Sequence, residues 1–399
     1  MLKGLAQAAF NFPVIDNHAH PLLKSEYRDK FPFESLISEA SGNALTQDAP
    51  YTLACFRATA QLAPLLDLDE NVTWDDVKAR RAEIPYLALC KRFMVSCQIQ
   101  CLLLDDGLEG VAEYAEGLGW HSHNFGDTRR IVRVEVEAET ILKELLTPHL
   151  HDFLDTFTQR LGNLLANHAK NPQVAAFKSI VCYRSGLHIS PNKPNLDDVS
   201  TLLYLQETFM KYQKEGVLRL DNKVLNDIVV HIALNVAGKF NIPVQFHTGL
   251  GDNDISLAHS SPALMQPIIT AYPCTKFVLL HSSYPYMRDA GYMASVYENV
   301  FLDFGEVFPC VSGHGQRSII QQILELTPTN KLLWSTDGHW FPESFYLGTL
   351  QARQALYDVL SEIVAKGELK ETQAISVIKD AFFSNSNRLY NLGLNEPEI

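Results

Sequence analysis

The sequence predicts an α/β fold, a (β/α)8 barrel in which parallel strands alternate with helices. Short apolar runs alternate along the chain with longer helical patterns, and the eight runs match the number that closes such a barrel. Two of the runs, IPVQF and KFVLL, are apolar apart from Gln245 and Lys276, as expected of parallel strands buried on both faces. A doubly wound open sheet is the alternative, but no G-x-G-x-x-G follows the first strand.

The expected elements follow one another in a regular order. The strands cover residues 13–20, 98–108, 129–137, 171–187, 242–249, 275–283, 299–307 and 330–338. The longer helical patterns cover 138–170, 197–216 and 222–240, and helices after about residue 370 close the barrel. Residues 24–95 are too long for an ordinary connection, so we interpret them as a helical insertion after the first strand. Because no Gly/Ser-rich or Pro-rich linker divides the chain, we expect a single barrel domain over 1–399.

Composition and charge restrict the class of protein. Of the 399 residues, 46% are hydrophobic, which is enough for the large core of a soluble enzyme. The formal net charge of −13 argues against nonspecific binding to nucleic acid or to an anionic membrane, since both need basic surfaces. We therefore expect a small molecule as the partner, and the sequence leaves a homo-oligomer open.

The cysteines and the apolar runs indicate the cellular compartment of the protein. The seven cysteines are scattered and form no C-x-x-C pair, as expected of free thiols in a reducing compartment. The start, MLKGLAQAAFNF, is too short and too weakly apolar for a signal peptide, and no run is long enough to span a membrane. We therefore expect a cytoplasmic protein.

Four histidines and an aspartate follow the predicted strands. His18 and His20 end the first strand, where residues i and i+2 point to the same face. His247, His281 and Asp337 end the fifth, sixth and eighth strands. All these strand ends meet at the face of a barrel where active sites lie. Imidazole and carboxylate ligands suit zinc best, and manganese, iron, cobalt or nickel are alternatives.

Further polar residues lie near the expected mouth of the barrel. Tyr183 and Arg184 follow the fourth strand, and the Arg184 guanidinium matches the two oxygens of a substrate carboxylate. An ordinary structural ion pair is the other interpretation of Arg184. By position, Glu306 and His339 lie near the rim and are candidates to contact the substrate.

Two other pairs carry weaker signals. Asp105 and Asp106 end the second strand, where they either cap the next helix or contact substrate. His121 and His123, in WHSHNFG, repeat the spacing of His18 and His20. Because no strand precedes this second histidine pair, we expect it to lie in a loop.

The order of these ligands resembles the amidohydrolase superfamily of metal-dependent hydrolases. The strings HTGLGDND, HSSYPYMRDAGYMA, FKSIVCYRSGL and AFFSNSNRLYNLG together resemble its amidohydrolase-2 branch. They are similar to the domain at the N-terminus of FluG-type proteins, where it precedes a glutamine-synthetase-like domain. The resemblance covers nearly the whole chain and implies a TIM barrel of the metal-dependent hydrolase type, without the synthetase-like domain.

The resemblance also implies a ligand set. His18, His20 and Asp337 would bind the metal, with His247 as a further ligand. Many superfamily members carry a carboxylated lysine after strand four that bridges two metals, and Lys178 is the candidate here. The predicted strand continues for several residues beyond Lys178, so a buried lysine paired to a carboxylate is the alternative. Without the lysine ligand, the site would hold one metal rather than two.

The chemistry that follows is hydrolysis of an amide or related C–N bond. A bound metal supplies hydroxide at neutral pH, and Asp337 would take the proton from water and pass it to the leaving amine. His281, with His247 nearby, would polarise the scissile carbonyl. The association with glutamine-synthetase-like domains implies a small carboxylate-bearing substrate such as a γ-glutamyl amide. The alternatives are a non-oxidative decarboxylase of the amidohydrolase-2 type and a non-catalytic regulatory barrel.

Overall fold

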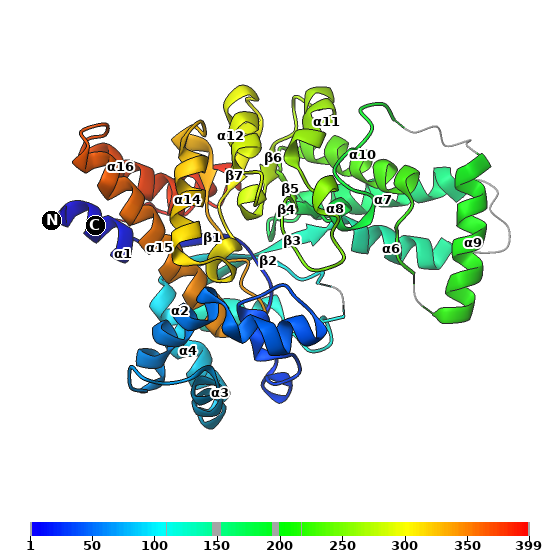
Figure 1. Ribbon diagram of the computed structural model, residues 1–399. Helices are drawn as coiled ribbons and strands as arrows, with labels where there is room; N and C mark the ends of the chain where they lie inside the picture. The colour runs from blue at the N-terminus through cyan, green and yellow to red at the C-terminus, as the bar shows by residue number, and fades with distance from the viewer. Residues whose placement is uncertain (1, 109, 146–152, 194–198, 217, 398–399) are drawn as a thin grey trace.

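A parallel eight-stranded sheet forms the centre of the molecule (Figure 1). The computed structural model describes residues 2–108, 110–145, 153–193, 199–216 and 218–397. The strands are β1 Val14–Ala19, β2 Ile99–Asp105, β3 Asp127–Arg133, β4 Val174–Ser179, β5 Val244–Phe246, β6 Phe277–Leu279, β7 Val300–Asp303 and β8 Leu332–Leu333. Their order in space is their order in sequence, and each is parallel to the next. This confirms the predicted barrel.

Backbone hydrogen bonds close the barrel between β1 and the segment that follows β8. The N–H of Asn17 donates to the carbonyl of Trp334 at 3.3 Å, and the N–H of Asp337 donates to the carbonyl of His18 at 3.0 Å. The first and last predicted ligand segments are therefore side by side, although more than 300 residues of chain separate them.

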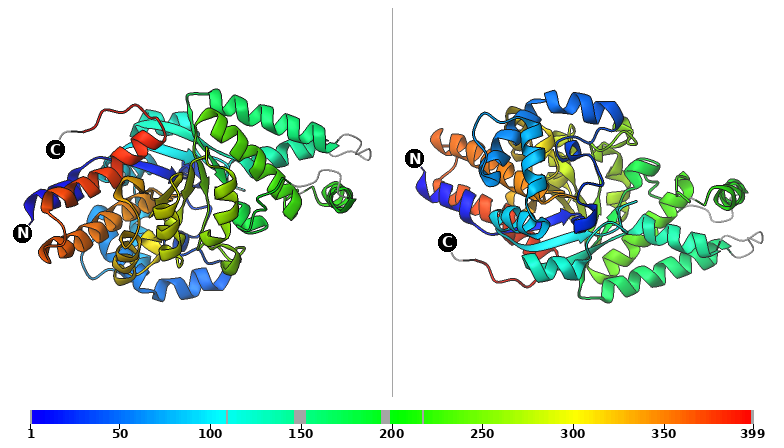
Figure 2. Two further views of the ribbon diagram at one scale, coloured as in Figure 1. Left: turned by 90° about the horizontal axis from the view of Figure 1, so that it is seen from above. Right: turned by 90° about the horizontal axis from the view of Figure 1, so that it is seen from below.

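Helices surround the sheet. Their bounds are α1 Lys3–Asn11, α2 Leu53–Leu62, α3 Trp74–Glu83, α4 Tyr86–Cys97, α5 Leu118–Phe125, α6 Val134–Leu145, α7 Phe153–Lys170, α8 Val181–Arg184, α9 Val199–Glu215, α10 Lys223–Phe240, α11 Gln266–Ala271, α12 Met287–Val296, α13 Val307–Cys310, α14 Gly313–Leu324, α15 Pro342–Ala365, α16 Glu371–Lys379 and α17 Asn385–Leu389. The helices α6, α7 and α10 extend away from the barrel toward α9, and the seventeen-residue α9 lies at the far end of this extension (Figures 1 and 2). No helix among the described residues is both long and apolar enough to cross a bilayer.

Several predicted boundaries were wrong. The third strand ends at Arg133, because α6 starts at Val134 and buries residues at helical spacing, such as Ala138, Ile141 and Leu142. The pattern over 138–170 belongs to two helices, α6 and α7, with 146–152 outside the described residues. The histidine pair of WHSHNFG lies in the helix α5 and not in a loop.

The fourth strand is also shorter than predicted. It ends at Ser179, and the short helix α8 begins at Val181, whose N–H donates to the Ser179 hydroxyl at 3.3 Å. Gly186, with φ of +85°, ends this turn in a conformation that favours glycine. Lys178 therefore lies at the carboxyl end of β4 and not in its middle.

The connection between β1 and β2 contains α2, α3 and α4, as expected of a helical insertion. It has its own apolar core, in which the ring of Phe33 stacks on Trp74 at 4.9 Å and meets the edge of Phe341 at 5.4 Å. Phe341 directly precedes α15, so the insertion is packed against the last large helix of the barrel. Figure 1 shows α2, α3 and α4 together on one side of the sheet.

Candidate metal centre

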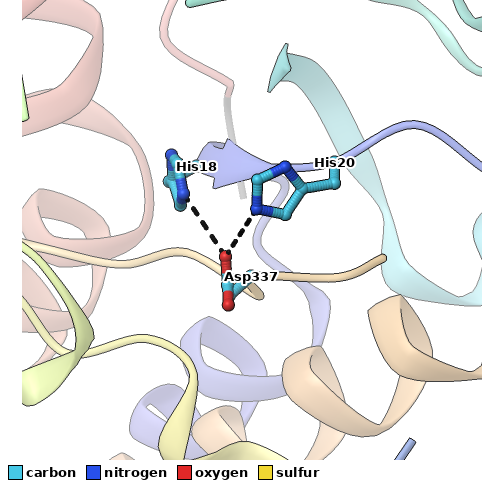
Figure 3. A group of neighbouring side chains, drawn as sticks. All are labelled: His18, His20 and Asp337. Carbon is cyan, nitrogen blue, oxygen red and sulfur yellow. Dashed lines mark ion pairs between the residues drawn. The ribbon is translucent and has the colours of Figure 1, made fainter. Parts of the chain in front are cut away.

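The end of β1 presents two buried imidazoles to one carboxylate. His18 and His20 are 0% and 6% exposed. Their Nε2 atoms lie 3.3 Å and 3.4 Å from Oδ1 of Asp337, so all three side chains point to one position (Figure 3). Strand alternation places the two imidazoles on one face, and barrel closure brings the aspartate to them.

Hydrogen bonds on the far side of each ring determine its tautomer. Nδ1 of His20 lies 2.9 Å from the carbonyl oxygen of Asp105, which can only accept, so Nδ1 carries the proton. Nδ1 of His18 lies 2.9 Å from Oε1 of Gln245. The Gln245 amide nitrogen donates to the Asn17 carbonyl at 2.7 Å, which fixes Oε1 as the atom that faces His18. Both rings therefore turn an Nε2 lone pair toward Asp337.

This arrangement fits a cation. Oδ1 of Asp337 is buried and has no hydrogen-bond partner among the described residues, yet two imidazole lone pairs face it. Three electron-pair donors directed at one another are stable only with a positive charge between them. Burial lowers the pKa of His18 to about 4, which keeps this imidazole neutral and able to act as a ligand.

A second group lies beside the first. Potential ligand atoms of His247, His281 and Glu306 are within 4.8 Å of one another, and all three side chains are buried. Nδ1 of His281 is 3.1 Å from Oε2 of Glu306. Nε2 of His247 donates to the carbonyl of Leu250 at 2.7 Å, which leaves the lone pair on Nδ1. Burial raises the pKa of Glu306 well above its usual range, and the Asp337 carboxylate adds to this effect.

Lys178 lies between the two groups. Its Nζ is 3.2 Å from Nε2 of His18 and 3.4 Å from Nε2 of His281. The predicted continuation of β4 past Lys178 argued against a ligand role for this residue. Because the strand ends at Ser179, that argument no longer applies. Burial lowers the pKa of Lys178 to about 8, while Asp105 and Asp337 act in the opposite direction. The amine is therefore easier to deprotonate than an exposed lysine.

The two groups form the floor of a cavity of about 510 Å³. Tyr183 lines this cavity, and its ring centroid is 4.5 Å from that of His247. A Cβ on Gly251 would lie 2.1 Å from the Tyr183 hydroxyl, so the loop after β5 packs tightly over this ring. His339 also lines the cavity, and its Nδ1 donates to the Asp337 carbonyl at 3.0 Å.

The arginine predicted as a carboxylate clamp is in an ion pair. Arg184 lines the cavity, but its guanidinium lies 3.5 Å from Glu139. The contact with Glu139 agrees with the interpretation of Arg184 as part of a structural ion pair. The position of Arg184 in the cavity wall agrees with the interpretation that it binds substrate.

Some residues of the site carried little signal in the sequence. Gln245 orients His18 and is a polar residue inside an apolar strand, which was the available clue. Asp105 neither caps a helix nor contacts the cavity, since its carboxylate pairs with Arg133 at 2.7 Å and its carbonyl orients His20. Glu39 lines the cavity from the insertion, and no local pattern marks it.

The other histidine pair lies outside this site. In α5, the buried His121 accepts a hydrogen bond from the Leu22 N–H at 3.1 Å and donates to the Gly117 carbonyl at 2.9 Å. His123 is exposed. Neither residue lines the cavity.

Eight parallel strands with histidines and an aspartate at their ends define a barrel of the metal-dependent hydrolase type. In agreement with this class, residues 218–391 match the amidohydrolase family model Amidohydro_2. The chain is 41% identical to protein fluG of Emericella nidulans over 421 residues, which cover 99% of this chain and 48% of that protein. The chain thus resembles the amidohydrolase-2 family over its C-terminal part, and it spans about half the length of this curated relative.

Solved structures support the same fold. A protein from Lactobacillus casei, provisionally described as a metal-dependent hydrolase, superposes with a TM-score of 0.82 at 25% identity, over 98% of both chains. An uronate isomerase from Bacillus halodurans superposes with a TM-score of 0.65 at 14% identity, over 99% of this chain and 96% of that one. The second likeness is one of fold alone.

Proposed function

We propose that this protein hydrolyses an amide or related C–N bond of a small carboxylate-bearing substrate, such as a γ-glutamyl amide. The observation that carries the proposal is the position of Lys178, whose amine lies 3.2 Å and 3.4 Å from one histidine of each ligand group. The buried amine of Lys178 thus lies within reach of both ligand groups at the floor of one cavity.

The residues of the site fit one or two divalent metal ions, with zinc suited best and manganese, iron, cobalt or nickel as alternatives. His18, His20 and Asp337 would hold the first ion, and His247 belongs to the group that would hold a second. The neutral amine of Lys178 would attack carbon dioxide and lose a proton, so that a carbamate with two ligand oxygens forms. Bound metal lowers the pKa of water to about 7 and polarises a carbonyl.

The chain's own groups would move the proton. As the water oxygen attacks the substrate carbonyl, the Asp337 carboxylate accepts a water proton. Asp337 then returns this proton to the nitrogen, the C–N bond breaks, and a carboxylic acid and an amine are released. The His281 imidazole, whose ring lies beside that of His247, would orient the oxygen of the substrate carbonyl.

The cavity supports a small substrate. Its volume of about 510 Å³ is within the usual range for small-molecule sites. Arg184 is the candidate for the substrate carboxylate, with Tyr183, Glu306 and His339 as further wall residues. The γ-glutamyl group is suggested by the association of FluG-type proteins with glutamine-synthetase-like domains.

We further infer a cytoplasmic protein with no nucleic-acid or membrane partner, either monomeric or a homo-oligomer. The net charge of −13 and seven free cysteines, five of them buried, support this view.

The test is elemental analysis of protein purified with and without added carbon dioxide, followed by turnover assays. We expect close to two equivalents of metal, dependent on carbon dioxide, and release of amines from a panel of small amides. One equivalent, independent of carbon dioxide, together with carbon dioxide release from aromatic acids would instead support the decarboxylase.

A further inference from the structure

Part of the insertion forms a wall of the cavity that also contains the ligand groups. This wall segment, residues 31–45, includes the short helix Phe33–Leu36 and supplies Ser38, Glu39 and Leu45 to the cavity lining. Phe33 and Leu36 are buried in the core of the insertion. The wall is therefore held by packing, and its polar groups have a defined place over the site.

Glu39 stands out among these groups. Its side chain is half-buried in the cavity wall, and it makes no hydrogen bond or ion pair with any residue that the structure describes. Burial raises its pKa to about 8, and the carboxylates of Asp337 and Asp252 raise it further. The charged groups that shift this pKa are thus acidic, and no cationic side chain in the described part of the chain forms an ion pair with Glu39.

The arginines of the cavity wall are paired within the protein. Arg133 pairs with Asp105, and Arg219 pairs with Asp254. The carboxylate of Asp252, on the loop after β5, accepts only the N–H of Asp254 among the described contacts, at 2.8 Å. Near Glu39, the wall therefore contains further carboxylate oxygens that have no ion-pair partner.

A partly buried carboxylate without a partner is costly, and a cation brought by the ligand removes that cost. A primary ammonium group has three N–H donors and matches a carboxylate flanked by a second acid. We propose that Glu39 binds a protonated amine of the substrate and selects for substrates that carry one. This inference rests on the proposed function and narrows its substrate class to amides with both a carboxylate and an ammonium group.

The test uses two amides that differ only in the amine. L-γ-glutamyl-p-nitroanilide carries the α-ammonium group. Glutaryl-p-nitroanilide keeps the same chain and carboxylate and lacks only that group, and L-2-hydroxyglutaryl-p-nitroanilide, with a neutral hydroxyl in its place, serves as the matched partner. We expect the metal-loaded protein to favour the amine by about 10- to 100-fold in kcat/KM. Glu39→Gln should abolish this preference by lowering kcat/KM for the amine substrate, and Glu39→Asp should retain part of it. Glu26→Gln, an exposed glutamate of the same insertion, is the matched control and should change neither rate.

The outcomes separate the two proposals. Equal turnover of the two amides, or an equal loss with both in Glu39→Gln, overturns the role of Glu39 and leaves the hydrolase proposal intact. If neither amide is cleaved, the hydrolase proposal fails for this substrate class, and calorimetry with L-glutamate and L-2-hydroxyglutarate tests Glu39 directly. Tighter binding of L-glutamate that is lost in Glu39→Gln supports the amine site. Equal binding of the two, or binding of neither, overturns it.

Discussion

The chain carries the motif H-x-H twice, once on β1 and once on α5, and the two copies have different surroundings. On the strand, His18 and His20 share a face, and both Nε2 atoms lie within 3.4 Å of Asp337. On the helix, residues two apart are about 200° apart around the axis, so His121 is buried while His123 is exposed. The spacing of two histidines is therefore informative only together with the element that carries them.

The comparison also separates two uses of a buried imidazole. Nε2 of His121 accepts the Leu22 N–H, so its lone pair is engaged inside the protein. The Nε2 lone pairs of His18 and His20 face the cavity instead. We expect substitutions on β1 to affect metal and activity, and substitutions on α5 to affect stability.

The largest effect is expected at His18. His18→Ala removes one of the three donors His18, His20 and Asp337, so bound metal and amide turnover should fall by more than about a thousandfold. Metal content and kcat/KM, measured on protein shown to be folded by circular dichroism, check this prediction. Full activity in this variant would contradict the assignment of His18 as a metal ligand.

A smaller effect is expected behind His18, at Gln245. Gln245→Leu removes the acceptor that fixes the His18 tautomer and should weaken metal binding by about 10- to 100-fold. Competition with a chelator measures the affinity. Gln173→Leu, at an exposed position before β4, serves as the control, and equal affinities in the two variants would refute the orienting role.

On α5, His121→Ala should leave the metal in place and destabilise the fold. It leaves the buried Leu22 N–H without its acceptor, which costs about 1–3 kcal/mol in the free energy of unfolding. Urea denaturation measures the loss. A drop in metal content at unchanged stability would remove the distinction between the two motifs.

The same histidine makes stability depend on pH. Burial lowers the pKa of His121 to about 4, so the unfolded chain takes up this proton more readily than the folded protein. Its contribution is complete above pH 6.5 and is lost as the pH falls toward 4, by roughly 2–3 kcal/mol. His121→Gln should flatten this part of the stability profile relative to the unaltered protein. Parallel profiles would show that another group titrates.

The smallest effect is expected at His123. Because its side chain is exposed and lies outside the cavity lining, His123→Ala should change the free energy of unfolding by less than about 0.5 kcal/mol and leave metal content unchanged. The assays used for His121→Ala apply here. A loss of activity would place α5 near the substrate.

By itself, the sequence determined the strand order and the residues that follow each strand. Apolar runs such as IPVQF are local signals, and consecutive parallel strands bring their carboxyl ends to one face, so the chemistry of that face could be predicted. The tertiary structure decided which of these residues are neighbours. It separates His247 from the group of His18 and places Lys178 between the two groups, because these distances depend on where β4 ends and how the barrel closes. It also decided the place of Glu39, because the path of the insertion depends on the packing of Phe33 against Phe341, about 300 residues away in the sequence.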